Sequence, residues 1–229
     1  MTAPVIEHHH ADVSGGWLRA ATFGAMDGLV TNIALIAGVG GGGAGSHTLV
    51  LTGVAGLVAG AISMGLGEYT SVATQNEQIS AELAKERHEL RVNPEGEREE
   101  LVATWTARGL PESLAREVAA ALRHHPEQEL RVHAQEELGV VPDELPSPWV
   151  AAGSSFVCFS VGALIPLIPY LLGFGSLGLA LGMGGLGLFA AGALFAGFTG
   201  RKWWLSGLRQ LALGALAATV TYGIGALIK

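Results

Sequence analysis

Apolar residues fill five long windows of the chain, and charged residues interrupt them at very few places. The windows lie at about 20–42, 47–67, 149–172, 176–199 and 210–228. Each is close to the roughly 20 residues that a helix needs to cross about 30 Å of hydrocarbon. The first window contains one charge, at Asp27, and Glu68 follows the second. The pattern predicts an all-α polytopic membrane protein with five transmembrane helices.

A segment of different character separates the second window from the third. Residues 76–146 hold 16 of the 20 carboxylates and 8 of the 13 basic residues. No helix breaker occurs between Ser71 and Val92, so the second helix is expected to continue to Val92 and to reach about 70 Å at 1.5 Å per residue. Asn93-Pro94 is typical of an N-cap followed by the first helical position. Later breaks are expected at Gly109-Leu110-Pro111, at His125-Pro126 and at Gly139. The segment is predicted to be a small acidic helical bundle between helices 2 and 3.

The domain boundaries follow from these two kinds of segment. We expect an N-terminal tail at 1–16, transmembrane helices 1 and 2 at 17–75, the acidic helical domain at 76–146 and helices 3 to 5 at 147–229. The first residues show no basic region or cleavage site of a signal peptide, which predicts that the first apolar window is retained. The histidines at 8–10 are interpreted as part of a flexible tail, with weak metal gathering as the alternative.

Composition and charge narrow the class of protein further. Only 14% of the residues are charged, against about 25% in a typical soluble chain. The formal net charge of −7 argues against nucleic acid as a partner, because phosphate binding needs a basic surface. One cysteine, Cys158, excludes both an intrachain disulfide and a cysteine-based zinc site. The lipid bilayer is therefore the expected environment.

The basic residues predict how the chain is oriented. Arg19 precedes the first window, eight basic residues lie in 76–146, and Arg201, Lys202 and Arg209 lie between the fourth and fifth windows. The loops after the first and third windows carry none. Since Lys and Arg in short loops mark the cytoplasmic side, the N-terminus and residues 76–146 are expected to be cytoplasmic.

Asp27 and Glu68 are the two carboxylates at or near membrane depth. A carboxylate there is costly unless it is paired, hydrated or bound to metal, so it indicates function. The structural alternative is a buried acid bonded to a neighbour such as Thr31 or Asn32. Met64 precedes Glu68 by four residues and shares its helix face. A thioether beside a carboxylate suits a borderline divalent ion such as Fe²⁺ better than Ca²⁺ or Mg²⁺.

The acidic segment offers a second candidate site. Glu86 and Glu89 are three residues apart, and so are Glu97 and Glu100. Because positions i and i+3 lie near each other on a helix, a fold at Asn93-Pro94 would bring the two pairs together. Four carboxylates in one pocket repel unless cations neutralise them. A metal site and a solvated acidic face both fit this spacing.

Three motifs resemble those of a known family. They are Gly24-Ala-Met-Asp27-Gly-Leu-Val-Thr-Asn32 in the first window, Ala61-Ile-Ser-Met64-Gly-Leu-Gly-Glu68-Tyr-Thr-Ser71 in the second and Pro166-Leu-Ile-Pro169 in the third. Together they resemble the vacuolar iron transporter family of proton-coupled Fe²⁺/Mn²⁺ exporters. The resemblance covers essentially the whole chain, including the order of the spans and the place of the acidic segment.

The resemblance implies a homodimer of five-helix protomers with the ion path along the subunit interface. Asp27, Met64 and Glu68 would line that path. Residues 76–146 would be the family's cytoplasmic metal-binding domain, with Glu86, Glu89, Glu97, Glu100 and Glu137 as its carboxylates. Where better-known members have two consecutive methionines, this chain has His133 and Ala134. His133 lies one helical turn before Glu137 and can supply a nitrogen ligand instead, whereas Ala134 supplies none.

The function expected from these features is export of a divalent transition metal from the cytoplasm in exchange for protons. Fe²⁺ or Mn²⁺ would be the transported and bound ion, with no prosthetic group, and the residue types do not separate the two ions. A membrane-anchored metal sensor or storage protein is the alternative, although it would not need Asp27, Met64 or Glu68. An enzyme is not expected, because no nucleophile lies beside a base at membrane depth. Ten Arg against three Lys fits a GC-rich bacterium and hence a plasma membrane; a eukaryotic source would imply the vacuolar membrane.

Overall fold

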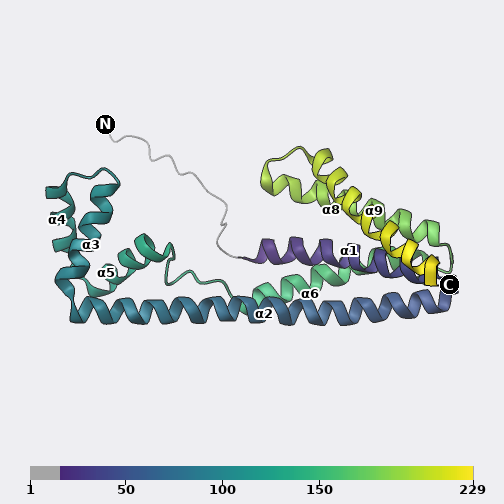
Figure 1. Ribbon diagram of the computed structural model, residues 1–229, viewed down its shortest axis with the longest axis horizontal. Coiled ribbons are helices and arrows are strands. Elements are labelled where there is room, and N and C mark those ends of the chain that lie inside the picture. Colours follow the sequence, from purple (N-terminus) through teal and green to yellow (C-terminus); the bar gives the residue numbers. More distant parts are fainter. Residues whose placement is uncertain (1–15, 229) are drawn as a thin grey trace, which may run out of the picture. The chain divides into compact units, whose positions relative to one another are not determined.

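The computed structural model describes residues 16–228, and every regular element in that range is a helix (Figure 1). The chain divides into two compact units. The first, which we name the membrane unit, is built from residues 16–71 together with the chain from 147 onward, and the second, which we name the insert, from 72–146. The predicted tail and its three histidines lie outside the described residues, apart from Gly16.

Within residues 16–228, five helices are long and apolar enough to cross a membrane. They are α1 (Trp17–Gly41), α2 (Ser46–Val92), the run Pro148–Leu171, α8 (Leu177–Thr199) and α9 (Trp203–Ile228). The five predicted spans are therefore present as helices. The fifth helix starts at Trp203, whereas the charge-free window predicted a start near 210. The window was too short because Arg209 interrupts it, but Arg209 does not interrupt the helix. A long basic side chain near a helix end can carry its charge to the interface, so one Arg does not stop a helix.

The third span is interrupted in a way that its apolar composition did not indicate. It consists of α6 (Pro148–Leu164), a 3₁₀ turn η2 (Ile165–Leu167) and the short α7 (Ile168–Leu171). Pro166 and Pro169 cause the break, because proline lacks the backbone N–H that continues a helix. Asn32 of α1 donates its side-chain N–H to the carbonyl oxygen of Ala163 at 2.5 Å, just before the break. α1 therefore holds the interrupted span in place.

α1 lies at the centre of the membrane unit and packs against α6, α8 and α9. Its contact with α6 is a contact of backbones. A Cβ atom at Gly28 would lie 2.2 Å from the carbonyl oxygen of Phe159, and one at Gly162 would lie 2.4 Å from that of Ala25. Glycines at such positions let membrane helices approach closely. α1, the helix that carries Asp27, is thus closely packed against α6.

The insert is built from the second part of α2 followed by α3 (Pro94–Ala107), α4 (Glu112–Leu122), α5 (Pro126–His133) and the π-helical turn η1 (Ala134–Leu138). The predicted breaks are confirmed. The Asn93 side chain caps α3 by accepting the N–H of Gly96 at 3.3 Å. Gly139 ends η1 with a φ of 67°, a left-handed conformation that glycine adopts at little cost.

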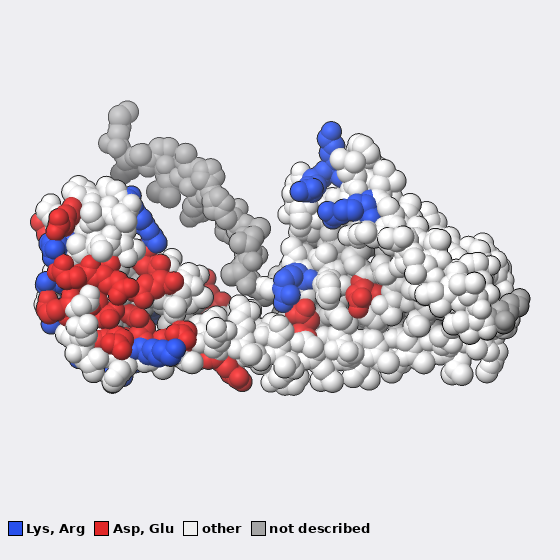
Figure 2. Space-filling view, viewed as in Figure 1, with Lys and Arg blue, Asp and Glu red and all other residues white. Residues whose placement is uncertain are grey.

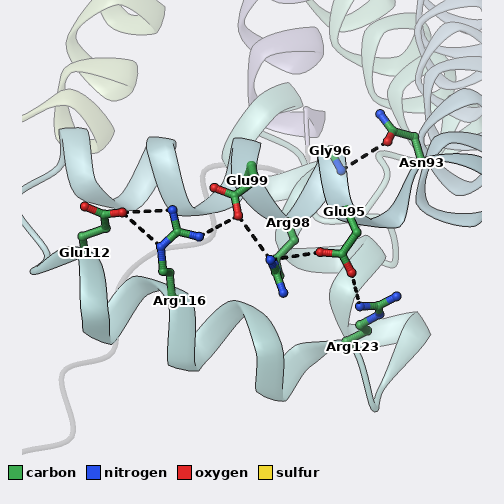
Figure 3. A network of polar contacts seen from close by, with 8 residues as sticks. All are labelled: Asn93, Glu95, Gly96, Arg98, Glu99, Glu112, Arg116 and Arg123. Atoms are coloured by element: carbon green, nitrogen blue, oxygen red, sulfur yellow. Dashed lines mark hydrogen bonds and ion pairs between the residues drawn. The ribbon is translucent and has the colours of Figure 1, made fainter.

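Apolar residues of α3 and α4 form the core of the insert, and ion pairs connect the outer faces of the same two helices. Leu101 and Val102 of α3 are buried with Ala115 and Ala119 of α4. Figure 3 shows the ion pairs, which are Arg116 with Glu99 and Glu112, Arg98 with Glu95 and Glu99, and Arg123 with Glu95. Because most of these side chains are exposed, the pairs contribute little to stability. Their consequence here is that these glutamates already have cationic partners.

Candidate metal centre

Four side chains from separate parts of the insert converge on one point. They are Glu86 of α2, Glu97 of α3, His133 at the end of α5 and Glu137 of η1, and each offers a ligand atom within 4.8 Å of the others. Nδ1 of His133 lies 3.1 Å from Oε1 of Glu86, 3.8 Å from Oε2 of Glu97 and 2.8 Å from Oε1 of Glu137. We name these four residues the carboxylate–histidine cluster.

Local structure explains why these residues meet. The chain turns at Asn93, so that α3 folds back and Glu97 comes to the side of α2 that carries Glu86. His133 and Glu137 are one turn apart, and the turn between them is a π-helix. Such turns are rare in proteins overall, but many of those that occur lie at functional sites. The cluster is therefore assembled by one cap, one reversal and one widened turn.

The cluster is enclosed and rich in negative charge. His133 is fully buried, and Glu97 is 8% exposed. Burial, followed by repulsion from Glu137, raises the pKa of Glu86 to about 7, although His133 acts in the opposite direction. Burial is also the main cause of the raised pKa of Glu97, to which Glu100 and Glu137 contribute by repulsion. A bound cation would relieve this repulsion directly.

The cluster also has an unused polar atom. Nε2 of His133 is buried and has no hydrogen-bond partner among the described residues. The nitrogen that faces the three carboxylates is Nδ1, so Nδ1 is the atom that a bound ion would use. An imidazole with three carboxylates is a donor set that suits first-row divalent ions such as Mn²⁺, Fe²⁺, Co²⁺ or Zn²⁺. The chemistry of the residues present thus fits a transition metal.

Two predicted members of the acidic site lie apart from the cluster. Glu89 and Glu100 are exposed and do not belong to the group of four. At 100° per residue, two positions three apart differ by about 60° around a helix. One glutamate of each predicted pair therefore faces inward and the other faces outward. Glu100 remains close enough to raise the pKa of Glu97 by repulsion.

The predicted residues of the membrane unit are dispersed over α1 and α2. Asp27 is half-buried and accepts a weak hydrogen bond of 3.4 Å from Oγ1 of Thr31. Asn32, the other neighbour considered, bonds Ala163 instead. Met64 packs against the buried group of Ala61, Phe159 and Ala163. Within residues 16–228, no group of three or more His, Cys, Asp or Glu ligand atoms forms around Asp27 or Glu68.

Glu68 has a partner that the sequence did not indicate. Its Oε2 lies 2.9 Å from Nη2 of Arg19. In the sequence Arg19 served only to orient the first span, and no spacing links residues so far apart. A second unpredicted contact lies in the insert, where Nε1 of Trp105 donates to Glu136 at 3.2 Å and Arg108 forms an ion pair with the same carboxylate. That contact fastens η1 to α3 beside the cluster.

The fold and the cluster together define a class of protein. It is an integral membrane protein whose described residues include five apolar helices long enough to cross a membrane. Its candidate metal site lies in the acidic insert, to which the second of these helices contributes its last part. Figure 2 shows the contrast between the two units, since acidic side chains gather on the insert, whereas the membrane unit shows mostly uncharged surface with a few basic and acidic side chains.

A family model described as the VIT family matches residues 18–226, and the chain belongs to this family. It is 38% identical over 217 residues to a vacuolar iron transporter of Acanthamoeba castellanii, covering 93% of this chain and 78% of that protein. Vacuolar iron transporter 1 of Oryza sativa subsp. japonica is 31% identical, with 97% and 90% covered. Vacuolar iron transporter 1 of Arabidopsis thaliana is 30% identical, with 98% and 92% covered.

These findings confirm the resemblance predicted from the three motifs. The relatives are named as transporters and not as enzymes, in agreement with the prediction that the chain is no enzyme.

Proposed function

We propose that the chain exports a divalent transition metal, Fe²⁺ or Mn²⁺, from the cytoplasm in exchange for protons. One observation carries the proposal: a carboxylate–histidine cluster suited to such ions occurs in a member of a family whose relatives are named vacuolar iron transporters. The ions are cargo, and no prosthetic group is required for this activity.

The insert is proposed to gather the metal. Residues 76–146 would form a cytoplasmic domain. Basic residues mark the cytoplasmic side, and they occur in this segment, before the first span at Arg19 and near the start of the fifth at Arg209. The excess of carboxylates attracts cations to the domain. Most outward-facing glutamates of α3 and α4 form ion pairs with arginines. The carboxylate–histidine cluster is therefore the site in the insert at which we propose that the metal binds.

The membrane unit is proposed to carry the metal across. Glu68 and Met64 would receive the ion at the inner mouth, and Asp27 would hold it deeper in the membrane. Metal binding needs an ionised carboxylate, so a proton and a metal ion compete for Asp27. Competition of this kind is the minimum requirement for antiport. By resemblance to the family, two copies of the chain would form the path at their interface.

The membrane that contains the protein is proposed to be a bacterial plasma membrane. The excess of Arg over Lys is the observation that favours it, and the eukaryotic relatives are named vacuolar. In both settings the same topology would move metal out of the cytoplasm.

Metal flux into proteoliposomes tests the proposal. The vesicles carry an imposed pH gradient, and Fe²⁺ and Mn²⁺ are offered separately to the wild type and to Asp27→Asn. We expect uptake that follows the proton gradient and that disappears in the variant. Retained flux in Asp27→Asn, with the protein correctly inserted, would remove Asp27 from the path.

The same experiment separates the alternative function. A membrane-anchored metal sensor or storage protein would bind metal at the carboxylate–histidine cluster and show no flux of either ion. In that case Asp27, Met64 and Glu68 would have structural roles only.

A further inference from the structure

One ion pair connects two helices of the membrane unit at a residue of the proposed path. Nη2 of Arg19 in α1 lies 2.9 Å from Oε2 of Glu68 in α2, 49 residues further along the chain. The two partners differ in their surroundings. The Glu68 side chain is 8% exposed, whereas that of Arg19 is 63% exposed. The carboxylate is thus fixed in the protein, and the guanidinium reaches it from a position open to the surroundings.

Charge is scarce in this unit, which makes the pair conspicuous. The described residues of the membrane unit contain two carboxylates, Asp27 and Glu68. They also contain four basic residues, of which Arg19 alone lies within 4.0 Å of either carboxylate. Asp27 has only the weak hydrogen bond from Thr31. Glu68 therefore has a cationic partner tethered beside it, and Asp27 has none among the described residues.

We propose that Arg19 sets the metal affinity and the charge selectivity of the inner mouth by competing with the incoming ion for Glu68. This inference rests on the proposed transport function. When the mouth is empty, the guanidinium neutralises the buried carboxylate. When a divalent ion arrives, it displaces the guanidinium, which swings away on its flexible stem. The exchange requires no covalent step.

The competition favours divalent ions for a simple electrostatic reason. At similar separation, an ion of charge +2 interacts with a carboxylate twice as strongly as the guanidinium of charge +1 does. A monovalent ion gains no such advantage over a cation that is already tethered. The Arg19 side chain is 63% exposed, so the guanidinium has room to move away when an ion takes its place at Glu68.

The competition also lowers the apparent affinity for metal. A site that is free for only a fraction of the time binds its ligand more weakly by that same fraction. Removing the guanidinium should therefore tighten metal binding at the mouth. A purely structural role, in which Arg19 merely fastens α1 to α2, predicts the reverse, because a loosened mouth binds less well or yields less folded protein.

Transport kinetics of Arg19→Gln in proteoliposomes test the proposal. We expect the KM for Fe²⁺ to fall about threefold or more, and added K⁺ to inhibit metal uptake in the variant at concentrations that leave the wild type unaffected. Arg19→Lys keeps a tethered charge and should restore a KM close to that of the wild type. Arg209→Gln removes one charge from the same unit away from Glu68 and should change neither quantity.

A KM that is unchanged or higher in Arg19→Gln, with transport retained, would overturn the role of Arg19. Absence of metal flux in the wild type would instead overturn the proposed function, so the two failures are distinct. If Arg19→Gln does not fold, Arg19→His gives the same test. Its KM relative to the wild type should fall when the external pH is raised from about 5.5 to about 8, because the imidazole loses its charge over that range. A constant ratio would overturn the proposal.

Discussion

At the scale of single residues, His133 has the most unusual position in the insert. It is fully buried, its Nδ1 faces three carboxylates, and its Nε2 has no partner among the described residues. The resemblance to the family predicts methionine at this position, whereas this chain has histidine. A nitrogen donor thus replaces a soft sulfur donor. The metal preference of this insert should therefore shift toward ions that favour imidazole.

Replacing His133 by Ala should lower the affinity of the insert for Co²⁺ at least about tenfold, because metal sites lose about that much even when a supporting residue is removed. Titration calorimetry on the purified full chain measures the change. His124→Ala is the matched control, since His124 is exposed and lies outside the cluster. Equal affinities for His133→Ala and the wild type would show that the imidazole is not a ligand.

The second residue-scale prediction concerns pH. Burial and the neighbouring Glu137 raise the pKa of Glu86 to about 7, so the carboxyl binds a proton as pH falls through that value. Metal binding needs the ionised form and must expel this proton. Affinity for Co²⁺ should thus decrease about tenfold from about pH 8 to about pH 6. The measurement is the same titration at the two pH values.

Glu86→Gln provides the control for this dependence. It should bind metal more weakly at both pH values but with a smaller difference between them, since the titrating group has been removed. A wild-type affinity that is the same at both pH values would contradict the assignment of Glu86 as a ligand.

At the scale of elements, the contact between α1 and α6 fixes the position of α1, the helix that carries Asp27. A Cβ atom at Gly162 would lie 2.4 Å from the carbonyl oxygen of Ala25 and 3.1 Å from the backbone nitrogen of Leu29. Neither backbone atom can move without shifting a helix. Gly162→Ala should therefore destabilise the protein by about 1–3 kcal/mol through overpacking.

Thermal denaturation in detergent, followed by size-exclusion chromatography, measures this effect as a lower apparent midpoint. Gly153→Ala is the control on the same helix, because nothing lies within 4 Å of a Cβ atom placed there. The control should leave the midpoint unchanged or raise it slightly, since Ala favours a helix more than Gly does. Equal midpoints for the two variants would contradict close packing at Gly162.

The sequence predicted the elements better than it predicted their contacts. Charge-free windows located the five spans, and Asn93-Pro94 located the reversal in the insert, because both depend on neighbouring residues. The position of Arg19 against Glu68 depends on how two helices meet, for which no local pattern exists. The exposure of Glu89 and Glu100 likewise depends on the rotation of each helix, and charge spacing alone left that undetermined.

The break in the third span and the start of the fifth show the limits of an apolar window. Pro166 and Pro169 are apolar by composition, so the window ran through them although their backbones cannot continue the helix. Arg209 ended the fifth window, although the helix extends back to Trp203. Composition therefore locates a span, whereas backbone chemistry and side-chain length decide its ends.

At the scale of the whole molecule, the proposed function assigns different tasks to the two units. The insert would concentrate metal, and the membrane unit would move it. A capture site raises the local concentration of ions without changing the path that they cross. Loss of the capture site should therefore alter how much metal the transporter needs, whereas loss of a path residue should stop transport.

The double variant Glu86→Gln with Glu97→Gln should raise the Fe²⁺ concentration for half-maximal flux while leaving the maximal rate near that of the wild type. Asp27→Asn should abolish flux while leaving Co²⁺ binding by the insert unchanged. The control is Glu77→Gln with Glu117→Gln, which removes the same charge from exposed positions of the insert outside the cluster. Flux in proteoliposomes and calorimetry, measured on the same preparations, compare all three. If the cluster variant lost its maximal rate while the control kept it, the cluster would be a step of the transport path itself, and the division of tasks between the two units would be wrong.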